Sequence, residues 1–123
     1  MDQLAMSHSV LLMMPQYADR LLFGDVLEHD GFATTRTESP PAAREEVERS
    51  EPEIVMIALD EDFDQAISLI DWLRGRGPAN CRIVGVTANP MAARKARQRG
   101  ADRCLQLPLP MRQVVTTLQD LIQ

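Results

Sequence analysis

The feature that most constrains the fold is an unbroken apolar run at residues 54–59, which acidic residues follow at once. A short run of branched residues without polar alternation is typical of a strand that is covered on both faces. A parallel sheet with helices on both sides provides that environment. In such sheets the chemistry usually lies where the strands leave the core, at their carboxyl ends. Ala58 stands at that point here, and its methyl group has no proton, lone pair or charge to offer.

Strand-like and helix-like segments alternate five times along the chain. The predicted strands span residues 9–14, 32–37, 54–59, 82–87 and 103–107. The predicted helices span residues 18–29, 39–49, 64–74 and 90–100, followed by a last segment that carries residues 114–122. This alternation predicts a parallel sheet with right-handed crossovers and helices on both faces. We therefore expect an α/β protein with three layers.

Composition indicates one globular domain that does not bind nucleic acid or membrane. The 123 residues are 45% hydrophobic, and the net charge of −5 opposes a general polyanion binder. Cys81 and Cys104 lie far apart, so neither a disulfide framework nor a zinc site is expected. The polar start of the chain is unlike a signal peptide, and no apolar run is long enough to cross a bilayer. We expect a cytoplasmic domain at residues 9–123 behind a flexible arm at residues 1–8.

Three blocks and the closing helix carry a resemblance to a known family. The blocks begin at Val10, Pro52 and Ile83, and the spacing from Val-Thr-Ala-Asn to Gly-Ala-Asp and on to Leu107-Pro108 is their most specific part. Over about residues 9–123 the chain resembles the receiver domain of two-component response regulators. The resemblance implies a flavodoxin-like fold: a three-layer α/β/α sandwich with five parallel strands in the order 2-1-3-4-5. It also implies a cis peptide bond before Pro108.

The same resemblance assigns the positions of the family's chemistry. Receivers catalyse their own phosphorylation on an aspartate that closes the third strand, and Ala58 matches that position. Met14 and Pro15 match the two acidic residues that bind magnesium. Leu107 matches the lysine that pairs with the phosphoryl group, whereas Thr87 keeps the hydroxyl that ends the fourth strand.

Phosphorylating a carboxylate needs a nucleophilic oxygen, a hard cation with oxygen ligands, and a positive charge on the phosphoryl oxygens. Ala58 removes the first, Met14 and Pro15 remove side-chain ligands, and Leu107 removes the last. A thioether is too soft a ligand for magnesium. We therefore predict that Met14, Ala58 and Leu107 extend the hydrophobic core, and that the chain neither catalyses phosphotransfer nor holds a metal or cofactor at this position.

Two alternatives remain open at the sheet edge. Asp60 could act as a displaced phosphoacceptor; the simpler interpretation is a solvated acidic loop in which Asp62 or Asp64 favours the start of the next helix. A flavodoxin-like ligand binder is the other alternative. Its phosphate loop should offer small residues with free N–H groups, whereas residues 14–17 offer bulk and a proline.

A basic stretch predicts a surface for a partner. Arg94, Lys95, Arg97 and Arg99 follow one another on a predicted helix without an acidic residue. Family receivers commonly use the face of the fourth helix, fifth strand and fifth helix for partners, and Cys104 occupies the place of the family's aromatic switch residue on that face. A solvated helix face is the alternative. The partners that the resemblance implies are a histidine kinase, another regulator or a second copy of the chain.

Overall fold

The computed structural model describes residues 7–123, so the predicted flexible arm lies mostly outside the described residues. Strands and helices alternate along these residues, as the apolar pattern predicts. The strands are β1 (Ser9–Met13), β2 (Ala33–Thr37), β3 (Ile54–Ala58), β4 (Arg82–Thr87) and β5 (Arg103–Gln106). The helices are α1 (Tyr17–His29), α2 (Pro40–Ser50), α3 (Phe63–Arg76), α4 (Pro90–Arg99) and α5 (Met111–Leu121).

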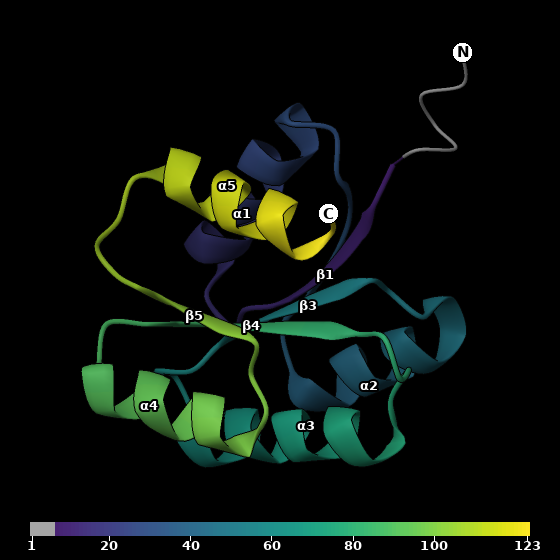
Figure 1. Cartoon of the computed structure of the whole chain (residues 1–123), viewed down its shortest axis with the longest axis vertical. Coiled ribbons are helices and arrows are strands. Elements are labelled where there is room, and N and C mark those ends of the chain that lie inside the picture. Colours follow the sequence, from purple (N-terminus) through teal and green to yellow (C-terminus); the bar gives the residue numbers. More distant parts are fainter. Residues whose placement is uncertain (1–6) are drawn as a thin grey trace.

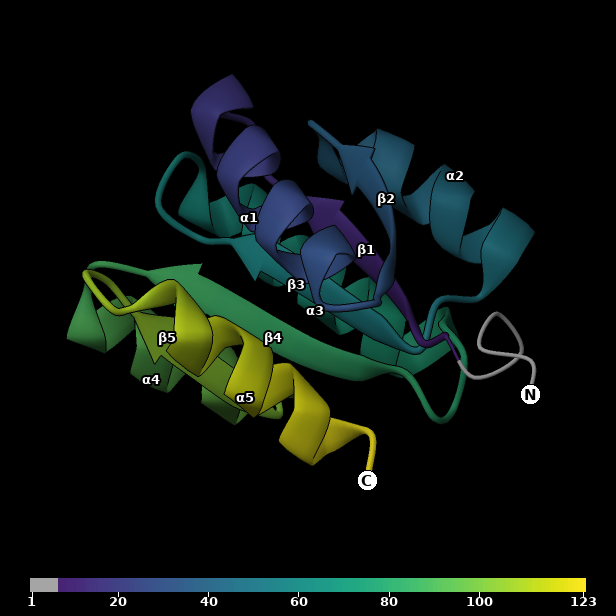
Figure 2. The ribbon, with the colours of Figure 1, turned by 90° about the horizontal axis from the view of Figure 1, so that it is seen from above.

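The strands form one parallel sheet in the order β2-β1-β3-β4-β5, which confirms the predicted flavodoxin-like sandwich. Helices α1 and α5 cover one face of the sheet, and α2, α3 and α4 cover the other (Figure 1). Because all strands run the same way, their carboxyl ends meet at one edge of the sheet. Strand β5 lies at the side of the sheet, between α4 below it and α5 above it (Figures 1 and 2).

Two apolar clusters, one on each face of the sheet, hold the layers together. Successive strand residues point to opposite faces, so Leu11 and Ile57 join the cluster under α2, α3 and α4. Leu12 and Met56 join the cluster under α1 and α5. The central strand is buried on both faces, as its unbroken apolar run predicts.

Side-chain caps fix the starts of three helices. The Ser39 hydroxyl accepts a hydrogen bond from the Ala42 N–H, and the Asp62 carboxylate accepts one from the Gln65 N–H. Asn89 caps α4 in the same way. These acceptors satisfy N–H groups that the helix itself leaves without a partner, so the caps set where α2, α3 and α4 begin.

The predicted boundaries of the five strands and of α1 to α4 agree with the observed ones to within two residues, and α5 begins three residues before the segment predicted for it. On α2, Glu46 is buried beside Ala43 and Val47, whereas Ala42 is only half buried. A hydrogen bond from Arg49 lowers the pKa of the Glu46 carboxyl, so this acid stays ionised beside the core. The peptide bond between Leu107 and Pro108 is cis, as the resemblance implies. No helix within residues 7–123 is long and apolar enough to cross a membrane.

Candidate functional site

The carboxyl ends of four strands bring Met14, Ala58, Thr87 and Leu107 to one edge of the sheet. Strands β1, β3, β4 and β5 are neighbours in that order, and Ala58 lies beside Val86 in the register of β3 and β4. The Leu107 N–H donates to the Thr87 carbonyl at 2.8 Å, which places the end of β5 beside the end of β4. The structure therefore assembles the positions that the sequence assigned to the receiver chemistry.

Met14, Ala58 and Leu107 pack in the cluster under α1 and α5, as predicted. Met14 is fully buried, and the other two are partly buried against the same cluster. Together with Phe23 and Val86 they line a cavity of about 90 Å³ at the sheet edge. Apolar side chains therefore form much of the cavity wall, as the sequence predicts for Met14, Ala58 and Leu107.

Three carboxylates, which the sequence reasoning did not place together, complete the lining: Asp19, Asp60 and Glu61. Glu61 accepts a hydrogen bond from the Gln16 side chain, so it is tied to the start of α1. No cluster of three acidic, histidine or cysteine side chains in residues 7–123 is arranged to hold a metal ion.

The Arg20 side chain on α1 reaches Met14 and Pro15, the two residues that match the magnesium ligands of receivers. Its guanidinium donates to the main-chain carbonyls of Met14 at 2.8 Å and Pro15 at 2.9 Å. Carbonyl oxygens are the kind of hard ligand that magnesium accepts, and here a cationic side chain already bonds to them. Residue type and position along the chain gave no signal for this contact.

Asp60 is exposed, but its carboxylate is not simply solvated. One oxygen accepts a hydrogen bond from the Thr87 hydroxyl, and the other accepts one from the Ala88 N–H at 2.8 Å. Thr87 is fully buried, and its hydroxyl oxygen accepts a further bond from the Asn89 N–H at 2.9 Å. The sequence places Asp60 two residues beyond β3 and Thr87 at the end of the neighbouring strand, but it does not show that the two side chains meet.

The basic residues of α4 are all exposed, and they face two different neighbours. Arg99 forms a two-pronged ion pair with Asp71 on α3. Lys95 lines a groove of about 410 Å³ between α3 and α4, beside Phe63 and Met91. Residues three apart on a helix are neighbours, so Arg94 and Arg97 form a separate pair.

Cys104 lies on β5 next to Arg97. Its thiol is half buried and contacts the Ala93 carbonyl at 3.4 Å. Burial raises the pKa of this thiol, and the nearby Arg97 guanidinium partly opposes the rise. The Cys104 thiol is therefore largely protonated at neutral pH, and it acts as a packing group rather than a nucleophile.

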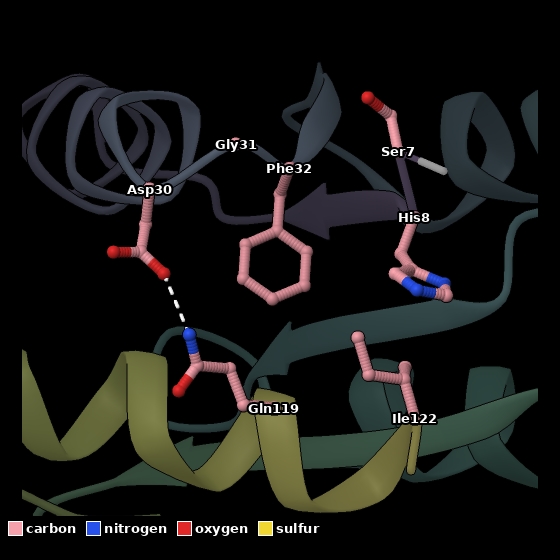
Figure 3. Close-up of a pocket in the computed structure, with 7 residues that line it drawn as sticks. All are labelled: Ser7, His8, Asp30, Gly31, Phe32, Gln119 and Ile122. Atoms are coloured by element: carbon pink, nitrogen blue, oxygen red, sulfur yellow. Dashed lines mark hydrogen bonds between the residues drawn. The ribbon is translucent and has the colours of Figure 1, made fainter. Parts of the chain in front are cut away.

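A separate cavity of about 360 Å³ lies near the amino ends of the strands. Figure 3 shows it between the start of β1 and the end of α5, where Asp30 accepts a hydrogen bond from the Gln119 side chain at 2.9 Å. The ring nitrogen of His8 lies 2.9 Å from the Glu53 carboxylate. Since this cavity is at the opposite edge from Thr87, it is separate from the candidate site.

Comparison with known proteins bears on the fold. No family model matches the chain, and no curated protein matches it. Solved structures do match. The receiver domain of a response regulator from Bermanella marisrubri superposes with a TM-score of 0.87 at 22% identity, covering 95% of this chain and 99% of that chain. The chain has the receiver fold.

Two further solved structures support the same statement. A response regulator from Thermotoga maritima gives a TM-score of 0.84 at 16% identity, covering 94% of this chain and 98% of that chain. The receiver domain of NtrX from Brucella abortus gives 0.83 at 17% identity, covering 92% and 97%. At these identities the likeness establishes the architecture, and the function must be argued from the site residues.

Proposed function

We propose that this chain is a receiver-like signalling domain that is not phosphorylated and that acts through protein contact in a two-component pathway. The observation that carries the proposal is the methyl group of Ala58 at the end of β3, with Met14 and Leu107 packed around the same cavity. No carboxylate stands where a receiver would accept phosphate, and no lysine stands where one would pair with it. We therefore assign the chain no enzymatic activity.

Asp60 is the side chain that could replace the missing acceptor. Its two oxygens already accept hydrogen bonds from Thr87 and Ala88. Hydrogen bonds of this kind draw electron density away from the carboxylate oxygens, which makes Asp60 a weaker nucleophile. We place Asp60 outside the chemistry for this reason and keep phosphorylation at Asp60 as the competing hypothesis.

A small phosphodonor separates these two hypotheses. The purified chain is incubated with acetyl phosphate and magnesium, and its intact mass is measured beside that of Asp60→Asn. We expect both proteins to keep their original mass. A phosphoryl adduct that forms on the wild-type chain and is missing in Asp60→Asn would establish the competing hypothesis.

The surface that we assign to partner binding is the edge made by α4, β5 and α5. Arg94 and Arg97 on α4 and Arg103 on β5 are exposed there, in a chain whose net charge is −5. The Arg94 side chain makes no hydrogen bond or ion pair within residues 7–123, so its charge is available to an acidic partner. A histidine kinase, another regulator or a second copy of the chain fits this description, and we place the interaction in the cytoplasm.

Charge reversal tests the surface. Arg94→Glu with Arg97→Glu should weaken self-association in sedimentation experiments, or the capture of partners from the native cytoplasm, while the melting temperature stays nearly unchanged. Arg76→Glu, an exposed change at the end of α3, serves as the control for a reversed charge elsewhere. Equal association of the wild-type chain and the double variant would remove this surface from the proposal.

A further inference from the structure

The Asp60 carboxylate connects the end of strand β3 to the residues just before helix α4. Strand β3 ends at Ala58, and Asp60 reaches sideways from the following loop to the end of β4. It accepts from the Thr87 hydroxyl with one oxygen and from the Ala88 N–H with the other. Thr87 is the last residue of β4 and Ala88 is the first residue of the connection to α4, so Asp60 holds the start of that connection at two points.

The hydrogen bonds continue from this connection into α4. The buried Thr87 hydroxyl accepts from the Asn89 N–H at 2.9 Å. The Asn89 side chain in turn accepts from the Met91 N–H at 2.9 Å and caps the helix. An unbroken series of bonds therefore runs from Asp60 to the first turn of α4, the helix that carries Arg94 and Arg97.

A hydroxyl and a main-chain N–H that converge on one point form a binding place for an oxyanion. A carboxylate has the same charge sign and the same acceptor oxygens as such an anion, and charge-assisted hydrogen bonds of this kind are about twice as strong as neutral ones. In this chain the anion is a side chain, so it is always present at high effective concentration.

We propose that Asp60 is an internal anion that permanently occupies the oxyanion-binding place at the end of β4 and thereby holds α4 in one arrangement without phosphorylation. The inference rests on the proposed function, because it gives the arrangement its purpose: the basic surface on α4 is always presented. It also accounts for Thr87, whose hydroxyl has a partner here although Ala58 and Leu107 have lost the rest of the chemistry.

Amide hydrogen exchange tests the inference without reference to any partner. Asp60→Ala removes both acceptors, whereas Asp64→Ala removes an exposed carboxylate from the same segment that has no hydrogen bond or ion pair within residues 7–123. We expect exchange at Ala88 and Asn89 to rise about tenfold in Asp60→Ala and to stay unchanged in Asp64→Ala. Unchanged exchange at both amides in Asp60→Ala would overturn the inference.

Chemical rescue tests whether Asp60 acts through its negative charge or only through the space that its side chain fills. Sodium acetate added to Asp60→Ala should restore slow exchange at Ala88 and Asn89, whereas sodium chloride at the same ionic strength should not. Acetate that restores nothing would overturn the anion role. Association of the Arg94→Glu, Arg97→Glu variant is scored separately: if it is normal while Asp60→Ala shows fast exchange and rescue, the proposed partner surface fails and the internal anion stands.

Discussion

An aspartate at the end of β3, where receivers carry their phosphoacceptor, should damage this protein rather than activate it. The side chain of Ala58 borders the cavity of about 90 Å³ that also has Met14 and Leu107 in its lining. A carboxylate introduced by Ala58→Asp fits that space, so steric overlap is not the main cost. The new charge would be half buried beside Asp60, with no lysine to pair with it.

The size of the effect follows from the cost of an unpaired buried polar group, about 1–3 kcal/mol. For a chain of this length, that loss lowers the melting temperature by roughly 3–10 °C. Ala58→Asn is the matched control, because it adds the same shape without the charge. We expect Ala58→Asp to be less stable than Ala58→Asn by about 1 kcal/mol at pH 7 and the gap to narrow as acid protonates the carboxyl.

Thermal and urea denaturation of the three proteins measure these differences, and incubation with acetyl phosphate and magnesium tests the chemistry. Ala58→Asp should remain unphosphorylated, because Met14, Pro15 and Leu107 still lack the ligands and the cation. The reasoning is refuted if Ala58→Asp is as stable as the wild-type chain, or if it takes up a phosphoryl group in the presence of magnesium.

Three further predictions concern stability. Burial raises the pKa of the Cys81 thiol to about 11, so the native state holds this proton more tightly than the unfolded chain does. The free energy of unfolding, measured by denaturant titration, should be constant below pH 9 and fall by on the order of 2 kcal/mol between pH 9 and 11. Cys81→Ala should not show this fall. Asp102 accepts from the Ile83 N–H at 2.7 Å and pairs with Arg74 at 2.6 Å, so Asp102→Ala should lower the urea-derived free energy of unfolding by about 1–3 kcal/mol, and a loss below experimental error would refute that role. Glu51 follows the last residue of α2 with a φ of 46°, a left-handed conformation that glycine adopts without strain. Glu51→Gly should therefore stabilise the protein by about 0.5 kcal/mol and raise its melting temperature, and a lower melting temperature would contradict this.

The fold was predictable because its signals are local. The apolar run of β3 needs cover on both faces, and the alternation of five strands with five helices leaves few other topologies. The packing of Met14, Ala58 and Leu107 was predictable for a related reason: each follows or ends a strand, and parallel strands bring these ends to one edge. Ser39 and Asp62 are residue types that favour helix N-caps, and each stands directly before the helix that it caps.

The contacts that escaped the sequence depend on geometry between distant segments. Asp60 meets Thr87 only because β3 and β4 pair in one register and the loop after Ala58 turns sideways. Arg20 folds back onto the carbonyl of Met14, and Arg99 turns toward Asp71 on another helix. The partners of long polar side chains depend on the three-dimensional arrangement of the elements, so the spacing of residues along the chain does not identify these partners.

The central claim is that the phosphorylation site of a receiver is replaced here by hydrophobic packing and an internal carboxylate. The most direct test is an NMR titration of the wild-type chain with magnesium and a phosphate analogue such as beryllofluoride. We predict no saturable shifts at the amides of Ala58, Asp60 and Thr87. Specific, saturable shifts around Ala58 at low magnesium concentration would contradict the claim.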